Sequence, residues 1–453
     1  MNDERNFLGT EPLGKLLRKL AIPAITAQLI NMLYNLVDRI YIGHIPNEGA
    51  LALTGLGVCM PIILIISAFA ALVGNGGAPR ASIFMGKGDI DTAENILGNC
   101  FSLQIVLSVV LTAILLIWNE TFLLAFGASE NTIKYATDYM NIYAIGTIFV
   151  QLTLGMNAFI TAQGFAKIGM ISVIIGAVSN IILDPIFIFA LDMGVKGAAL
   201  ATVISQALSC FFVLFFLFGK QTILKLKLKN SNIKLSIILP CLALGLATFI
   251  MQASESIISI AFNSSLLKYG GDIAVGAMTI LSSVMQFAML PLAGIGQGAQ
   301  PIISYNFGAK NKERVIGAFK LLLKYSLIYS VTLWLIIMIA PKLFASMFTQ
   351  DLALILFTKD ALRIYCAALF MFGIQISCQM AFTSIGNAKA SIIVAVTRKF
   401  ILLLPLIFIM PRIITSNQTT AVYLAEPIAD FIAVTFTMIL FKKQFKESLL
   451  LLE

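Results

Sequence analysis

Long apolar runs constrain the fold of this chain more than any other feature of its sequence. Each run has the roughly 20 mainly apolar residues that an α-helix needs to cross the hydrocarbon core of a bilayer. Twelve such runs lie near residues 17–43, 51–77, 95–118, 135–158, 165–190, 195–218, 235–262, 274–299, 316–340, 361–384, 388–410 and 419–441. Charged residues make up only 12% of the chain, about half of the share that is usual in soluble proteins. The sequence therefore predicts an all-α integral membrane protein with twelve transmembrane helices, surrounded by the lipid bilayer.

The two halves of the chain resemble each other. The stretch 76–89 contains a match to residues 300–311 at an offset of 222 positions, which pairs Gly86 with Gly308. The motif GFAK of the first half recurs as GNAK in the second half at the same offset. A constant offset across several predicted helices indicates two six-helix bundles related by a pseudo-twofold axis along the membrane normal, with the substrate path between them.

One long basic loop divides these halves and also indicates their orientation. We expect an N-lobe at 1–219 with helices 1–6, a basic cytoplasmic linker at 220–234, and a C-lobe at 235–453 with helices 7–12. Nineteen Lys and Arg residues fall on the side of this linker and of both termini, against six on the other side. Because basic loops stay in the cytoplasm, we expect a multi-pass protein of the plasma membrane with both termini cytoplasmic. The net charge of +9 has the same origin and indicates no nucleic-acid partner.

The residues needed for common enzyme chemistry are missing from the sequence. His44 is the only histidine, and it falls in an outer loop. The six cysteines lie in apolar stretches without metal or disulfide spacing, and no Walker A sequence is present, so neither a zinc site nor ATP hydrolysis is expected. We therefore expect neither an enzyme nor a bound cofactor.

A polar stripe runs along the first predicted helix. Its members share one helical face because they are three or four positions apart: Gln28, Asn31, Asn35 and Asp38. A carboxylate in hydrocarbon costs several kcal/mol, so this face must point towards protein or a water-filled cavity. At an offset of 217 positions, Asp38 falls on Glu255 and Asn35 falls on Gln252. Both halves are therefore expected to direct a carboxylate inward.

Predicted helices 4, 5 and 6 add further polar groups within the first half. These are Tyr139, Asn157, Asn180, Asp184, Thr202 and Gln206. Helices 1 and 5 run outward and helix 6 runs inward, which places Asp38, Asp184 and Thr202 at a similar depth. Oxygen ligands of this kind suit Na⁺, and a desolvated carboxylate also carries a proton. The alternative is a hydrogen-bond network that packs helices together and has no role in transport.

The second half carries charges at different places. Helix 11 contains Arg398 and Lys399, and helix 12 contains Glu426 and Asp430, four residues apart. Glu255 is expected either to form a structural ion pair with Arg398 or to line the substrate path. The roles of the remaining charged residues stay open at this point.

The order and spacing of these motifs resemble the multidrug and toxic compound extrusion (MATE) family over essentially the whole chain. The stretch LGTEPLGKLLRKLAIPAI, the following YNLVDRIYIG and the pair Asn180-x-x-x-Asp184 are similar to its bacterial DinF-like and MepA-like branch. This resemblance implies a secondary active transporter that uses only a coupling ion and exports amphiphilic, usually cationic compounds, driven by inward H⁺ or Na⁺. It also implies a coupling cluster in the N-lobe, at Asp38, Tyr139, Asn157, Asn180, Asp184 and Thr202. Na⁺, if it is the coupling ion, is expected at Asp38, Asn180, Asp184 and Thr202.

The remaining expectations concern the substrate cavity and the rival functions. We expect the cavity to be lined by Gln28, Asn31, Tyr34, Asn35, Gln206, Gln252, Glu255 and Met285, and the protein to act as a monomer on small organic substrates. Pro23 removes one backbone hydrogen bond from helix 1 and is expected to act as its hinge.

One alternative function is a lipid-linked oligosaccharide flippase of the same superfamily, which would favour a cationic cavity. The other is a membrane scaffold that transports nothing.

Overall fold

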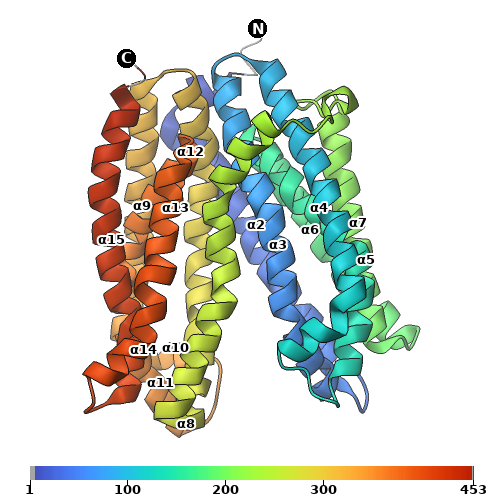
Figure 1. The fold of residues 1–453 in the computed structure, drawn as a ribbon, viewed down its shortest axis with the longest axis vertical. Helices are drawn as coiled ribbons and strands as arrows, with labels where there is room; N and C mark the ends of the chain where they lie inside the picture. Colours follow the sequence, from blue (N-terminus) through green and yellow to red (C-terminus); the bar gives the residue numbers. More distant parts are fainter. Residues whose placement is uncertain (1–5, 451, 453) are drawn as a thin grey trace.

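The computed structural model describes residues 6–450 and 452, and every regular element among them is helical (Figure 1). The first half contains α1 (Phe7–Thr10), α2 (Leu13–Gly43), α3 (Gly49–Gly86), α4 (Ile90–Ala125), α5 (Ile133–Ala162), α6 (Ala166–Pro185), a π-helical turn (Ile186–Ala190) and α7 (Gly194–Phe218). The second half contains α8 (Leu235–Gly308), α9 (Lys312–Ile339), α10 (Pro341–Ser346), α11 (Leu352–Tyr365), α12 (Phe372–Ser384), α13 (Ala388–Val396), a π-helical turn (Thr397–Leu403), α14 (Leu404–Ile413) and α15 (Gln418–Leu450). Short 3₁₀ turns cover Leu228–Asn230 and Leu369–Met371.

The 74-residue helix α8 contains two of the twelve predicted spans. A straight helix of this length would be about 110 Å long, several times the thickness of a bilayer. Its backbone breaks at Gly271, where φ is 66° and ψ is −164°, a combination that is essentially restricted to glycine. The chain reverses there, and the two limbs of α8 lie antiparallel (Figure 1).

The number of predicted spans is confirmed once two further features are considered. Ten helices of the described chain are long and apolar enough to cross a membrane, and α8 counts twice. Helices α11 and α12 together form one more span, which is bent by 45° around the 3₁₀ turn. Each half therefore supplies six spans, and the two halves form two adjacent bundles with both chain ends on the same side (Figure 1). We call these bundles the N-lobe and the C-lobe.

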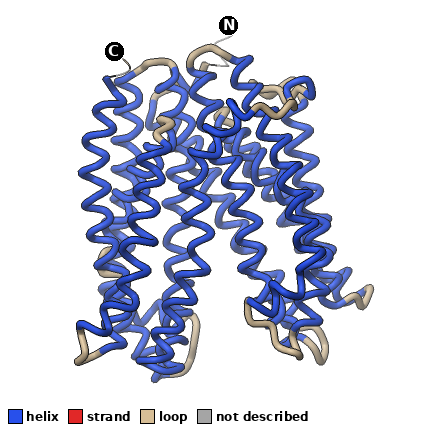
Figure 2. The backbone as a smooth tube through the Cα atoms, in the orientation of Figure 1, coloured by secondary structure: helices blue, strands red, loops and turns tan. Residues whose placement is uncertain are grey.

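The two lobes share a core at one end of the molecule only. One hydrophobic cluster contains buried residues of both halves, among them Leu16, Phe159, Ile302 and Phe382. Two further clusters belong to the second half alone and the first half alone. The backbone tubes correspondingly diverge towards the end away from the termini (Figure 2). The lobes are thus packed together near the termini and separate at the opposite end.

A reciprocal contact between α3 and α8 lies at the centre of the packed end. A Cβ atom on Gly86 would lie 1.9 Å from the carbonyl oxygen of Tyr305, and one on Gly308 would lie 1.9 Å from that of Ile83. Both glycines and both carbonyls are partners at the same offset of 222 positions. The pseudo-twofold axis therefore passes through this crossing, and only residues without a side chain allow the helices to approach so closely.

The basic segment between the lobes is folded against the N-lobe. Gln163 Oε1 accepts hydrogen bonds from the backbone N–H groups of Ile223 (2.9 Å) and Leu224 (2.7 Å). Asn99 Oδ1 accepts one from the N–H of Lys234 at 2.7 Å, and Lys227 forms an ion pair with the buried Glu94. The hydrogen bond to the Glu94 carboxylate raises the pKa of the Lys227 ammonium group. The predicted linker is therefore a fixed strap.

The start of the chain bridges the two lobes at the same end. Leu8 is fully buried, and its carbonyl oxygen accepts hydrogen bonds from Asn306 Nδ2 (2.9 Å) and Arg314 Nη2 (3.1 Å) of the C-lobe. The neighbouring Phe7 packs on Phe165 of the N-lobe, with 6.4 Å between ring centroids. Helix α2 follows and continues through Pro23 without a break.

We predict that Gly86→Ala lowers stability although alanine is the better helix former. The added methyl group would overlap the Tyr305 carbonyl, and overpacking of this kind costs about 1–3 kcal/mol. The matched control is Gly57→Ala in the same helix, where the Cβ position meets open space, so this variant should be neutral or more stable by up to about 1 kcal/mol. Thermal unfolding of both purified variants tests the crossing, and equal melting temperatures would contradict it.

Candidate functional site

Two buried carboxyl groups face each other in the N-lobe. Asp38 lies near the end of α2 and Asp184 near the end of α6, with 7% and 0% of their surfaces exposed. Their carboxyl groups are close enough to interact directly, and a proton on one of them would let it donate a hydrogen bond to the other. Two ionised carboxylates at this separation would repel each other strongly. The geometry thus favours a pair that shares a proton or binds a cation.

Neutral polar groups from two more helices complete this cluster. The Asn180 amide donates to Asp184 Oδ1 at 3.2 Å and to Thr202 Oγ1 at 3.4 Å. The hydroxyl group of Tyr139 in α5 is in hydrogen-bond contact with Thr202 in α7. Five of the six residues predicted for ion coupling therefore lie together in the N-lobe. We call Asp38, Tyr139, Asn180, Asp184 and Thr202 the acidic cluster.

Three acceptor atoms of the acidic cluster have no hydrogen-bond partner in the described part of the chain. Asp38 Oδ1, Asn180 Oδ1 and Asp184 Oδ2 are buried without a hydrogen-bond partner among the residues that the structure describes. Neither Asp38 nor Asp184 forms an ion pair with a Lys or Arg side chain in this part of the chain. Buried acceptors normally find a donor, so the arrangement suits an added proton or a monovalent cation. Groups of three or more His, Cys, Asp or Glu side chains that could hold a metal ion are absent from the described residues.

A cavity of about 40 Å³ adjoins the acidic cluster. It is lined in part by Asn31, Tyr34, Asn180, Thr202, Ser205, Gln206 and Ser209. Since one water molecule takes up about 30 Å³ in the liquid, this cavity holds a water molecule or a small ion but no organic compound. Three residues that were predicted to contact substrate, Asn31, Tyr34 and Gln206, therefore line an ion-sized space in this conformation.

Two serines of this cavity were missed by the sequence analysis. Ser205 and Ser209 follow Thr202 on α7 at steps of three and four residues, so all three share one helical face. The hydroxyl of Ser209 donates to the carbonyl of Ser172 in α6 at 2.8 Å. The spacing would have found them, because it is the same spacing that singled out the stripe on helix 1.

Other predicted site residues lie away from the acidic cluster. The Asn157 amide donates to the carbonyl of Gly169 at 3.3 Å and contacts neither carboxyl group through a hydrogen bond. Gln28 donates to Gln297 of the C-lobe at 3.3 Å, and the exposed Asn35 donates to the carbonyl of Asn31 at 2.7 Å. In the C-lobe, Gln252 and Met285 are half-buried, and the Met285 sulfur accepts from the thiol of Cys366 at 3.8 Å.

The C-lobe holds its charges in a different way from the N-lobe. Arg398 donates from Nε to Asp430 Oδ1 at 2.7 Å and from Nη2 to Glu426 Oε1 at 3.3 Å. All three side chains are less than 10% exposed, and the guanidinium group lies 4.8 Å from the ring centre of Phe372. Arginine can bind two carboxylates at once because its donors form a planar fork. This arrangement compensates most of the buried charge within the lobe.

The expected ion pair between Glu255 and Arg398 is not formed. Instead, Lys399 Nζ donates to Glu255 Oε1 at 2.6 Å, while Arg398 is held by α15. Consecutive helical residues point about 100° apart, so only one of the two cations can face α8, and the structure assigns that place to Lys399. The Glu255 side chain remains 56% exposed, whereas that of Lys399 is 6% exposed.

We predict that Arg398→Met destabilises the protein by about 3–5 kcal/mol, because it leaves two buried carboxylates without their cation. Adding Glu426→Gln and Asp430→Asn to the same variant should restore part of this loss. As a control, Lys359→Gln removes a cation from the exposed pair with Asp360, and such pairs contribute about 0–1 kcal/mol. Thermal unfolding in detergent distinguishes these variants; additive losses in the triple variant would contradict the network.

Comparisons with known proteins agree with this architecture. The model of the MatE family matches residues 23–186 and, a second time, residues 247–409. The multidrug export protein MepA of Staphylococcus haemolyticus (strain JCSC1435) is 24% identical over 435 residues, which cover 96% of this chain and 95% of that protein. MepA of Staphylococcus aureus (strain N315) is 24% identical over 414 residues, 90% of each chain.

Solved structures share the fold over nearly the whole length. A structure described as the outward-facing conformation of a multidrug resistance MATE family transporter of the MOP superfamily superposes with a TM-score of 0.91 at 23% identity, covering 99% of each chain. Structures of MATE described as straight and as bent give TM-scores of 0.91 and 0.90, with the same identity and coverage.

Proposed function

Because the chain belongs to the MatE family and is therefore a secondary transporter and not an enzyme, we propose that it exports amphiphilic, cationic organic compounds by antiport with protons. The observation that carries the proposal is the buried pair of Asp38 and Asp184, whose neighbouring carboxyl groups form no ion pair with a Lys or Arg side chain among the described residues. The name of the MepA relatives, multidrug export protein, supports the substrate class. Na⁺ is the second candidate for the coupling ion, with Asn180 and Thr202 as its neutral ligands.

Coupling of ion and substrate transport follows because the acidic cluster has two charge states, one with and one without the bound ion. Antiport requires that ion and substrate each favour a different conformation of the transporter. A proton taken up by the pair removes a negative charge from the N-lobe, and its release restores the attraction for a cationic substrate. The cavity of about 40 Å³ beside Asn180 admits the ion but not the substrate in the present state.

The conformational change is assigned to rocking of the lobes, assisted by helix α2. Asp38 lies on α2, which also carries Pro23, fifteen positions earlier. Proline lacks the backbone donor that an unbroken helix needs at this position, so α2 can bend there at low cost when the charge near Asp38 changes.

The C-lobe argues against the flippase alternative. A cationic cavity for a pyrophosphate group needs basic side chains that are available to the ligand. The two candidates, Arg398 and Lys399, are already bound by carboxylates of the same lobe. A scaffold without transport activity would have no need for an unpaired acidic cluster, because burying it is costly.

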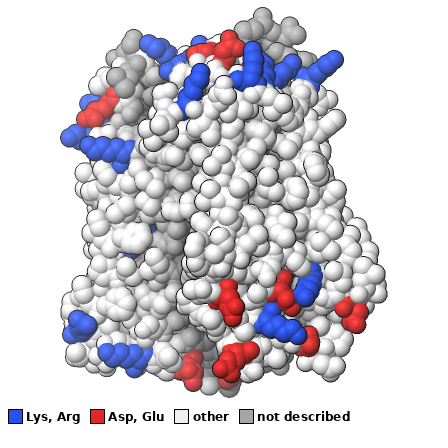
Figure 3. Space-filling model, turned by 45° about the vertical axis from the view of Figure 1, so that its right-hand side comes forward, with Lys and Arg blue, Asp and Glu red and all other residues white. Residues whose placement is uncertain are grey.

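We further propose that the protein works as a monomer in the plasma membrane with both termini cytoplasmic. Lys and Arg side chains gather at the end where the termini lie, whereas both signs are mixed at the other end (Figure 3). The lobes are packed together at the basic end, so the present conformation would be open to the outside.

Cysteine labelling tests this orientation. Leu228→Cys lies in the strap and Lys268→Cys at the opposite end, before the break at Gly271, and both positions are exposed. The six native cysteines are buried. In intact cells an impermeant maleimide should label position 268 but not position 228, and permeabilised cells should show labelling at both. The reverse pattern would place the termini outside.

Asp38→Asn tests the coupling mechanism. This change keeps the shape of the side chain but fixes it in an uncharged state, so we predict normal folding, retained substrate binding and loss of coupled export. Proteoliposome flux of a fluorescent organic cation, under separately imposed H⁺ and Na⁺ gradients, provides the measurement. The exposed Asp272→Asn is the control and should transport normally. Wild-type coupled flux in Asp38→Asn would show that this aspartate is structural.

A further inference from the structure

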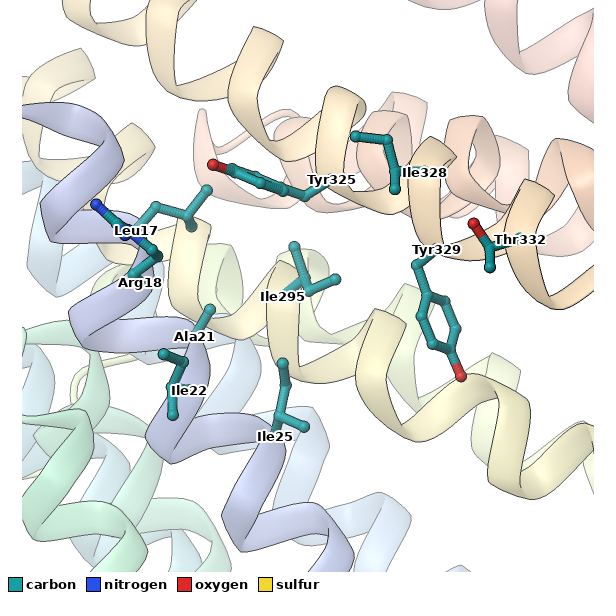
Figure 4. A pocket seen from close by; sticks show the side chains of 10 residues that line it. All are labelled: Leu17, Arg18, Ala21, Ile22, Ile25, Ile295, Tyr325, Ile328, Tyr329 and Thr332. Carbon is teal, nitrogen blue, oxygen red and sulfur yellow. The ribbon is translucent and has the colours of Figure 1, made fainter.

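A groove on the outer surface of the bundle lies where the two lobes meet. It has a volume of about 380 Å³, within the range of sites that bind small molecules. Helix α2 of the N-lobe forms one wall, and α8 and α9 of the C-lobe form the floor and the other wall (Figure 4). The exposed Ile22 and Ile328, 60% and 53% accessible, show that the groove opens towards the hydrocarbon of the bilayer.

The groove carries polar groups with few hydrogen-bond partners among the described residues. Arg18 and the hydroxyl of Tyr325 lie towards one end, and Tyr329 and Thr332 lie further along (Figure 4). Arg18 donates only to the carbonyl of Gly14, at 3.2 Å, and pairs with no acid among the described residues. No hydrogen bond to another described residue is found for the hydroxyl groups of Tyr325, Tyr329 or Thr332 either. An apolar channel with a free guanidinium group at its mouth suits an anionic amphiphile and disfavours a cationic one.

The equivalent surface of the other lobe lacks these groups. At the offset of 222 positions, Tyr325, Tyr329 and Thr332 correspond to Leu103, Leu107 and Val110. At the offset of 217 positions, Arg18 corresponds to Leu235. The pseudo-twofold axis therefore repeats the helices but not the polar groups. Helix packing alone, which is common to both sides, does not account for them.

We propose that this groove binds one anionic glycerophospholipid from the leaflet on the side of the termini. Its phosphate lies at Arg18, its glycerol and ester oxygens accept a hydrogen bond from Tyr325, and one acyl chain follows the groove past Ile295 towards Thr332. Anionic lipids attract basic side chains next to the membrane surface. The proposal does not depend on which compound the protein exports.

Occupancy of this site is coupled to the conformation of the transporter. At the floor of the groove α2 touches α8 closely, because a Cβ atom on Gly294 would lie 2.5 Å from Ile25 and one on Gly298 would lie 2.6 Å from Ala21. Rocking of the lobes moves these helices relative to each other and reshapes the groove. A lipid that fits the present shape therefore favours this state over the alternative.

Lipid titration of the purified full-length protein tests the site. In detergent, added palmitoyl-oleoyl phosphatidylglycerol should raise the melting temperature in a saturable way, whereas the phosphatidylcholine with the same acyl chains should have little effect. Glycerol 3-phosphate provides the headgroup chemistry without acyl chains and should also have little effect. Equal stabilisation by the two lipids, or full stabilisation by glycerol 3-phosphate, would overturn the proposal.

Substitutions inside and outside the groove test whether phosphatidylglycerol binds there. Arg18→Gln should raise the half-saturating concentration of phosphatidylglycerol about fivefold, the contribution typical of one basic residue near an anionic membrane surface. Lys442→Gln removes an exposed cation outside the groove and should titrate like the wild type. Ile328→Trp fills the groove and should lower the number of phosphatidylglycerol molecules retained in native mass spectrometry. Equal losses in Arg18→Gln and Lys442→Gln, or unchanged retention in Ile328→Trp, would show that no such site exists.

Discussion

The cost of placing a carboxylate in a medium of low polarity governs the interior of this protein. The two lobes meet this constraint in opposite ways. In the C-lobe, Arg398 and Lys399 form ion pairs with three nearby acids, which compensates most of the buried charge. In the N-lobe, Asp38 and Asp184 have only each other and neutral neighbours such as Asn180, and they depend on a particle from outside the chain. An uncompensated buried pair suits the proposed coupling site, whereas paired charges suit a structural role in the other lobe.

Much of this arrangement could be predicted from the sequence, for identifiable reasons. The twelve spans followed from apolar length, and the meeting of Asp38, Asp184 and Thr202 followed from helical spacing together with the direction in which each helix runs. Both are local or nearly local properties. Two predicted spans are continuous in α8, and the chain reverses between them at Gly271 without an intervening loop. The length of the apolar runs could not indicate this.

Side-chain partners were harder to predict because they depend on rotation of a helix about its axis. Arg398 and Lys399 are neighbours in sequence, and the choice between them for Glu255 depends on roughly 100° of rotation. The π-helical turn that contains both residues changes this rotation further. Asn157 illustrates the same limit, since it points to Gly169 and not to the acidic cluster. The strap is held by hydrogen bonds to Gln163 and Asn99, which are distant from it in sequence. A periodic sequence pattern cannot predict contacts of this kind.

The reciprocal crossing of α3 and α8 has the form of a contact between two identical subunits. Gly86 of one half meets the carbonyl of residue 305, while its counterpart Gly308 meets the carbonyl of residue 83, so the same patch is used on both sides. Such an isologous contact is the form taken by the interface of a symmetric homodimer. An even number of spans returns each half to the side on which it began, and a strap of some fifteen residues suffices to join the end of one to the start of the next. The molecule therefore has the interface geometry of a symmetric dimer of six-helix subunits within one chain, with an uncompensated acidic cluster in one half and ion-paired charges in the other.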